Sequence, residues 1–310
     1  MSPNPIVLLG SGADPQIQRV GACLAAVDAP FAVWDATSFP QTESLSFDAR
    51  GPRFSVPLDA PPAAAYVRGL KTSPLSSSFH DELLARPRGL VAQCEEKRAL
   101  LEPVLLYLED TGCRMVNTIA ANAIHGRKPW QLSVLGRAGL PTPRWIATND
   151  PDSARTFFDA VGDVVYKPLA GGAAVRLLEA KDKAPERLEL LRNAPVLFEE
   201  YVPGLALRVF VVDAKAVAAA SIASTEIDYR LAEGEVRATA LSTEEREIAL
   251  HAARTCQMPF SGVDLIRGAA GRVCLLECNP SPMFAVFEEK TGCDVAGPLA
   301  AYLVHAAAQR

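Results

Sequence analysis

Residues 264–280 read DLIRGAAGRVCLLECNP, two apolar runs with oxygen-bearing side chains at their ends. These side chains are Asp264, Glu277 and Asn279. Mg²⁺ is a hard cation that prefers carboxylate and amide oxygens, and Glu277 and Asn279 share one face of a strand because they are two residues apart. The segment predicts a metal site. Taken alone it equally allows an ordinary strand end, because Asn-Pro also opens turns.

Residues 164–172 read VVYKPLAGG and lead from a strand to a lysine and a glycine-rich loop. Lys167 could place a positive charge against phosphate oxygens, and the loop at Gly171 and Gly172 could supply backbone N–H groups. A hairpin with an exposed lysine is the alternative. Lys128, in the basic stretch His125-Gly-Arg-Lys128, reads equally well as a solvated surface charge.

Length and composition indicate a globular protein of two or three packed units, since 310 residues exceed the size of a single core. The net charge of −5, without a long basic run, argues against a nucleic-acid partner. No apolar run approaches the roughly 20 residues of a membrane span, and no signal peptide is recognisable. We therefore expect a cytoplasmic protein with no membrane partner.

The seven cysteines are odd in number and contain no Cys-x-x-Cys pair. We therefore expect neither a zinc site nor a disulfide framework. Cys274 and Cys278 flank a dense apolar strand pattern, where a free cysteine usually behaves as a small buried hydrophobe.

The order of apolar segments predicts an α/β protein, with α+β lobes in its C-terminal part. A strand at 5–10, a helix at 17–27 and a strand at 31–34 predict a βαβ opening on a parallel sheet. Residues 51–89 are rich in proline and indicate irregular structure. We expect three domains, bounded at 1–112, 113–195 and 196–310.

Further elements follow the same periodicities. We expect helices at 90–109, 119–138, 153–160 and 294–309, and strands at 113–117, 145–147, 163–167, 175–179, 196–201, 208–212, 262–266 and 272–278. The last helix should close the fold.

Five motifs in order resemble the ATP-grasp domain of RimK-type ligases. They are NAIHGRK (122–128) with the run through Gly139-Leu-Pro-Thr-Pro143, VYKP (165–168), LFEEYVPG (197–204), RVFVV (208–212) with Asp264, and LECNPSP (276–282). The resemblance covers about residues 112–305 and implies an ATP-grasp fold behind an N-terminal Rossmann-like domain. The N-terminal part, with Asp35 and Phe39-Pro40, is more loosely similar to microviridin-type ligases that macrocyclise ribosomal peptides (graspetide enzymes).

The resemblance implies a role for each candidate residue. Lys128, Lys167 and the loop at Gly171 and Gly172 would contact ATP phosphates. The adenine would meet Glu199, Glu200, Tyr201 and Val202. Asp264, Glu277 and Asn279 would hold Mg²⁺ or Mn²⁺, and the catalytic arginines would be Arg208, facing the γ-phosphate and acyl phosphate, and Arg230 on the substrate side.

Two positions depart from the relatives. Where they usually carry an acidic residue that binds ribose, this chain has Ala206, and where RimK-type relatives often carry a second arginine, it has Ser221. Stabilisation of the acyl phosphate would then rely more on Arg208 and Arg230.

The activity implied is an ATP-dependent carboxylate–amine ligase that forms an amide or ester through an acyl phosphate. Three substrate versions stay open: crosslinking of a precursor peptide, addition of an amino acid to a protein or peptide, and joining of two small metabolites. From other classes, a non-catalytic nucleotide-binding regulator and a peptide-binding partner protein are the alternatives. Relatives are commonly dimers or tetramers, so the resemblance allows a homo-oligomer.

Overall fold

The computed structural model of the chain describes residues 5–58, 60–70, 73–76, 79–170, 174–223 and 235–309. The chain divides into two compact units. The first consists of Met1–Ile119, Met283–Ala285 and Val295–Arg310, and the second of Ala120–Pro282 and Val286–Asp294. The expected three-part division at 112 and 195 stays a prediction.

A four-stranded parallel sheet forms the centre of the first unit, in the order β2-β1-β5-β6. Its strands are β1 (Ile6–Gly10), β2 (Phe31–Asp35), β5 (Ala64–Val67) and β6 (Arg114–Val116). Every residue of β1 is buried, as expected for a parallel strand covered on both faces. The parallel pairing of β1 and β2 around a helix confirms the predicted βαβ opening.

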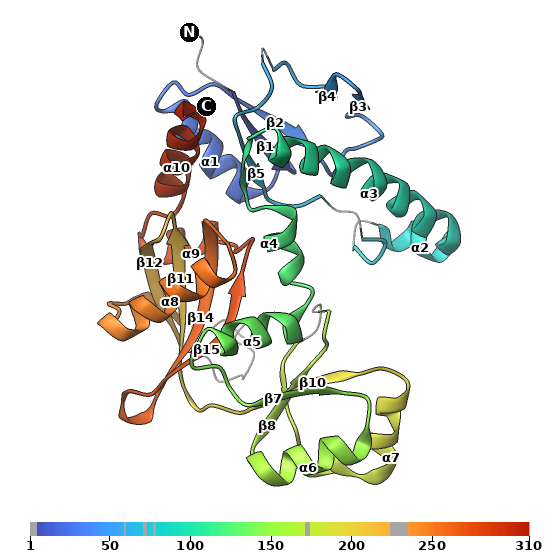
Figure 1. The fold of residues 1–310 in the computed structure, drawn as a ribbon, viewed down its shortest axis with the longest axis vertical. Helices are drawn as coiled ribbons and strands as arrows, with labels where there is room; N and C mark the ends of the chain where they lie inside the picture. The colour runs from blue at the N-terminus through green and yellow to red at the C-terminus, as the bar shows by residue number, and fades with distance from the viewer. Residues whose placement is uncertain are drawn as a thin grey trace. The chain divides into compact units, whose positions relative to one another are not determined.

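Helices cover this sheet (Figure 1). Helices α1 (Pro15–Ala25) and α10 (Ala296–Ala308) pack against each other and against the strands, although they come from opposite ends of the sequence. The long helix α3 (Pro87–Asp110) supplies Leu101, Leu105 and Leu108 to a core that includes Val7 and Leu9 of β1. The short helix α2 (His80–Ala85) and the hairpin of β3 (Leu45–Asp48) and β4 (Gly51–Phe54) complete the unit.

The second unit contains a four-stranded antiparallel sheet, in the order β7-β10-β8-β9. The strands are β7 (Trp145–Thr148), β8 (Val164–Lys167), β9 (Arg176–Leu177) and β10 (Val196–Glu200). The helical segments beside it are α6 (Pro151–Val161), η2 (Ala180–Lys183), α7 (Pro185–Leu188) and η3 (Glu189–Arg192). Phe158 of α6 meets Phe198 of β10 edge-on, with ring centroids 5.0 Å apart, inside a small apolar core.

The second unit also contains a five-stranded antiparallel sheet, in the order β13-β12-β11-β14-β15. Its strands are β11 (Gly204–Val212), β12 (Lys215–Ala223), β13 (Glu235–Ala238), β14 (Phe260–Gly268) and β15 (Val273–Asn279). Leu207, Val209 and Val211 of β11 lie in an apolar core of this unit, with residues of helix α8 (Thr243–Thr255). Since side chains alternate along a strand, Arg208 points to the opposite face.

Several sequence expectations differ from the structure. The single helix expected at 119–138 is two helices, α4 (Ile119–Ile124) and α5 (Lys128–Arg137), because Gly126 and Pro129 interrupt the pattern. The strand expected at 175–179 is only the two-residue β9. Helix α8, helix α9 (Ala285–Thr291) and the 3-10 turn η4 (Ala269–Gly271) were not predicted. None of the helices in the described ranges is long and apolar enough to span a membrane.

Candidate functional site

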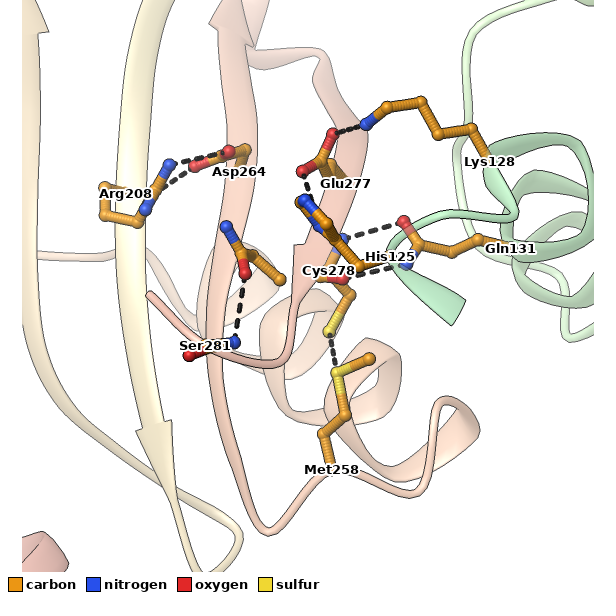
Figure 2. A network of polar contacts seen from close by, with 10 residues as sticks. His125, Lys128, Gln131, Arg208, Met258, Asp264, Glu277, Cys278 and Ser281 are labelled. Atoms are coloured by element: carbon orange, nitrogen blue, oxygen red, sulfur yellow. Dashed lines mark hydrogen bonds and ion pairs between the residues drawn. The ribbon is translucent and has the colours of Figure 1, made fainter. Parts of the chain in front are cut away.

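Arg208, Asp264 and Glu277 lie on neighbouring strands of the five-stranded sheet. The register pairs Arg208 of β11 with Asp264 of β14, and Asp264 with Glu277 of β15. Directly opposed residues point to the same face, so the three side chains share the face away from the α8 core. The Arg208 guanidinium forms a bidentate pair with Asp264, with Nε on Oδ1 and Nη2 2.9 Å from Oδ2 (Figure 2).

Glu277 forms its ion pair with a basic residue from a different element, helix α5. Lys128, the first residue of α5, donates its Nζ to Glu277 Oε2, and His125 Nδ1 lies 3.7 Å from Oε1 (Figure 2). The side chains of Lys128 and Glu277 are 12% and 21% exposed, so solvent screens this pair only partly. The structure therefore brings together residues that are 149 positions apart in the sequence.

The third proposed metal ligand, Asn279, ends β15 and lies opposite Gly262 of β14. Its Oδ1 accepts a hydrogen bond from the backbone N–H of Ser281 at 3.0 Å, which leaves the amide held in the turn after the strand. The register of β14 and β15 shifts between Asp264 and Leu265. Such irregularities often redirect side chains beside functional sites.

Lys167 and Glu199 form a separate buried ion pair in the four-stranded sheet. Lys167 ends β8 and Glu199 is the last residue but one of β10, and Lys167 Nζ is 2.8 Å from Glu199 Oε1. The two residues are only 8% and 3% exposed. Lys167 is therefore not the exposed hairpin lysine that the sequence allowed as an alternative.

The residues expected near adenine continue from β10 toward β11. Glu200 ends β10 and accepts a 3.3 Å hydrogen bond from the backbone of Arg144. Tyr201 is half-buried and Val202 is buried. These residues join the two sheets of the second unit, but their contact with a nucleotide stays a prediction.

Burial and charge act differently on the two carboxylates. Burial raises the pKa of Asp264, and the neighbouring charge of Glu277 adds to this effect, while Arg208 opposes it. Burial would also raise the pKa of Glu277, but the positive charge of Lys128, with those of Lys167 and His125, holds the pKa of Glu277 below its usual range. Glu277 is thus kept ionised, as a metal ligand must be.

The donor set fits a hard divalent cation. Asp264 and Glu277 would supply carboxylate oxygens from directly opposed positions, and Asn279 would supply an amide oxygen from the same strand as Glu277. Within the described residues, no three His, Cys, Asp or Glu side chains gather as ligands. Mg²⁺ commonly uses one or two carboxylates and completes its shell with water and phosphate oxygens, so two carboxylates and an amide suffice.

Three predicted residues, Gly171, Gly172 and Arg230, lie outside the described residues. Ala206 and Ser221 are the two positions where the sequence departs from its relatives. Ala206 lies on the same face as Arg208, between Ile222 and Ile266, so no carboxylate occupies that position. Ser221 pairs with Leu207 and therefore lies on the other face from Arg208.

Sequence reasoning did not assign three residues that the structure places at this site: His125, Gln131 and Gly262. His125 and Gln131 belong to the quoted motif run, but no local signal indicates their partners. Gly262 lies opposite Asn279, and a Cβ there would come within 3.3 Å of Arg208 Cδ. Cys274 and Cys278 are buried, as predicted, and burial raises the pKa of the Cys274 thiol to about 12.

Solved ATP-grasp ligases share this architecture over nearly the whole chain. The ligase PsnB, in a complex with a phosphomimetic variant of its minimal precursor, Mg and ADP, is 36% identical, with a TM-score of 0.89 over 97% of this chain and 98% of that chain. The macrocyclase MdnC from Microcystis aeruginosa MRC, bound to precursor peptide MdnA, matches with a TM-score of 0.76 at 20% identity, over 97% and 99% of the two chains. The fold is therefore the ATP-grasp fold, as the sequence predicted.

Sequence comparison identifies the branch of this class. The sequence model of the RimK-like ATP-grasp domain family matches residues 127–303 of this chain. The ribosomal protein bS6–L-glutamate ligase of Escherichia fergusonii is 34% identical over 207 residues, which is 63% of this chain and 69% of that protein. The chain belongs to the RimK-like ATP-grasp family and is a ligase.

Proposed function

We propose that this ligase uses ATP and Mg²⁺ to join a carboxylate to an amine or hydroxyl on a ribosomally made peptide. The extent of the likeness carries this proposal. PsnB, which was solved with its precursor peptide, matches 97% of the chain, including the N-terminal unit, at 36% identity. The match to the bS6 ligase covers only 63% of the chain.

The charged residues of the second unit support binding of a nucleotide and a metal. Asp264, Glu277 and Asn279 would hold Mg²⁺ or Mn²⁺, which would neutralise phosphate charge and orient the phosphates. Lys128 and Lys167 pair with Glu277 and Glu199 in this structure. With nucleotide bound, the two lysines would turn to phosphate oxygens. Residues 199–202 would contact the adenine.

The reaction has two steps. A peptide carboxylate attacks the γ-phosphorus of ATP, which forms an acyl phosphate and releases ADP. An amine or hydroxyl then attacks the acyl carbon, loses its proton and expels inorganic phosphate. Positioning and charge neutralisation dominate such phosphoryl transfer. Arg208 would stabilise charge on the transferred group, and Arg230 would act on the substrate side.

Mass spectrometry of a reaction mixture tests the proposal. Purified protein is incubated with ATP, Mg²⁺ and either the minimal precursor of PsnB or a pool of short peptides that contain Asp, Glu, Lys, Ser and Thr. A product lighter than its peptide by one water, together with ADP, supports an intramolecular crosslink. Nucleotide turnover without any peptide product would contradict the peptide proposal.

The second candidate is amino-acid addition to a protein or peptide, which the 34% identity to the bS6 ligase favours. Glutamate and other amino acids are therefore added to the same assay, where a peptide heavier by one residue identifies this activity. ATP binding without turnover in any mixture would favour the regulator. A cytoplasmic location and a homo-oligomeric state stay predictions.

A further inference from the structure

Gln131 makes two hydrogen bonds to the strand that carries Glu277 and Asn279. Its Nε2 donates to the carbonyl oxygen of Cys278 at 2.8 Å, and its Oε1 accepts from the N–H of Cys278 at 3.0 Å (Figure 2). Cys278 is the residue between Glu277 and Asn279. One side-chain amide thus satisfies the whole backbone of the residue that separates the two proposed metal ligands.

These bonds occur at the open edge of the sheet. Within the described residues, β14 is the only strand that pairs with β15, which makes β15 an edge strand. Edge strands have N–H and C=O groups without a strand partner, and on β15 the N–H of Leu275 also donates to a loop carbonyl, that of Pro141, at 2.8 Å. Gln131 and Cys278 are 3% and 0% exposed, so water does not replace the bonds. Buried backbone groups need partners, and Gln131 supplies both for this residue.

The same residue is also held from the core side. Cys278 Sγ lies 3.5 Å from Met258 Sδ in the core beneath the sheet (Figure 2). Because side chains alternate along a strand, Glu277 and Asn279 point away from that core. Gln131 therefore holds the backbone of Cys278, and Met258 contacts its side chain. Together these contacts leave Cys278 little freedom to move.

Helix α5 connects this contact to the proposed phosphate lysine. Gln131 follows Lys128 by three residues, and such residues share one face of a helix. Lys128 contacts the side chain of Glu277 while Gln131 contacts the backbone of the next residue. The helix and the strand therefore meet through both residues.

We propose that Gln131 is a positioning residue, which sets the Glu277 and Asn279 side chains for the metal by fixing the backbone of Cys278 to α5. The inference rests on the proposed roles of Glu277 and Asn279 as metal ligands. The chemistry is specific to glutamine at this distance, because leucine has neither donor nor acceptor and asparagine is shorter by one methylene.

The test compares Gln131→Leu with Leu135→Ala on the same helix. Leu135 is 0% exposed and packs in the apolar core, and its side chain has no donor or acceptor for the backbone of Cys278. Its truncation therefore destabilises the unit by loss of packing and not by loss of a hydrogen bond. ADP binding is measured by calorimetry over a series of Mg²⁺ concentrations, together with the Tm of each protein. All measurements are made well below the lowest Tm.

Gln131→Leu is expected to raise the Mg²⁺ concentration needed for half of the full ADP affinity by about tenfold or more, the usual effect of losing a group that orients ligands. ADP affinity without Mg²⁺ should change less than twofold. Leu135→Ala should lower the Tm but leave the Mg²⁺ response within twofold. If Gln131→Leu does not fold, Gln131→Asn keeps an amide and is expected to show a smaller shift in the same direction.

An unchanged Mg²⁺ response in the Gln131 variants would overturn the inference, and so would an equal shift in Leu135→Ala. The wild type separates this failure from that of the proposed function. If the ADP affinity of the wild type does not change with Mg²⁺ concentration, the metal site itself is refuted. If the wild-type affinity depends on Mg²⁺ and the Gln131 variants show the same dependence, only the positioning role is refuted.

Discussion

Asp264 and Glu277 lie directly opposite each other on β14 and β15, yet each is paired with a different cation, Arg208 and Lys128 respectively. Two neighbouring carboxylates repel each other when both are ionised. Arg208 and Lys128 reduce this repulsion, because each places a positive charge beside one of the two carboxylates. In the proposed function, a divalent cation would bind both carboxylates, and Arg208 and Lys128 would then contact phosphate oxygens.

Glu277→Gln should abolish ATP turnover and leave the fold intact. The change removes one charge from the proposed metal site with almost no change in volume, and we expect a loss of about a hundredfold or more in kcat, similar to the removal of a strong electrostatic contact in other enzymes. ADP formation and a thermal melt measure the two effects. Glu247→Gln, at an exposed position of α8, is the control. Turnover at the wild-type rate would refute the metal assignment.

Lys167→Ala should weaken nucleotide binding and also destabilise the protein. Glu199 would stay buried without its cation, which typically costs about 3–5 kcal/mol. The double variant Lys167→Met/Glu199→Leu removes both charges and should recover most of the stability, but not the affinity for ATP. Calorimetry and denaturant unfolding separate the two properties. Full ATP affinity in the double variant would contradict the phosphate role of Lys167.

Gly262→Ala should disturb Arg208. A Cβ at this position would lie 2.7 Å from Pro282 Cβ and 3.3 Å from Arg208 Nη1, so the neighbouring groups must move. Displacement of a reacting group by about 1 Å can cost roughly a hundredfold in rate, and we expect a loss of that order in ADP formation. Gly136→Ala is the matched control, because its Cβ would meet only Thr142 Oγ1, at 3.7 Å. Normal activity of Gly262→Ala would show that the Arg208 position is not critical.

Glu245 should make stability sensitive to acid. It is 1% exposed, and Arg267 donates to its carboxylate through Nε at 2.6 Å and Nη2 at 2.7 Å, which holds the pKa of Glu245 below its usual range. The carboxylate of Glu245 therefore binds a proton more readily in the unfolded chain than in the folded chain. The stabilisation is complete above about pH 4.3, the ordinary pKa of glutamate, and is lost as the pH falls through the lower folded pKa.

Glu245→Gln is accordingly expected to lower the free energy of unfolding at pH 7 by about 1–3 kcal/mol. The difference from the wild type should shrink as the pH falls below 4. Denaturant unfolding at pH 7 and at lower pH measures both values, with Glu247→Gln on the same helix as the control. A difference that stays constant with pH would show that ionisation of Glu245 contributes nothing.

Elements with strong local patterns were predicted well. The apolar runs at 264–280 and the strands before them appear as β14, β15, β8 and β10. The prediction was weaker where the residues have low propensity for the element they form, and where a helix-start signal in the sequence was not interpreted. Strand β5 reads AAYV, and alanine has low strand propensity. Helix α8 was missed although Ser242 and Glu245 form a capping box, which is a local helix-start signal.

The family and the candidate charged residues follow from the sequence, because ordered motifs and apolar periodicity are properties of neighbouring residues. The pairing of those residues does not. Asp264 meets Arg208 and Glu277 through the register of three strands, and Glu277 meets Lys128 through a helix 149 residues away. The role of Gln131 likewise depends on β15 being an edge strand. Register and edge position are set by long-range packing, so only the tertiary structure decided how the site is assembled.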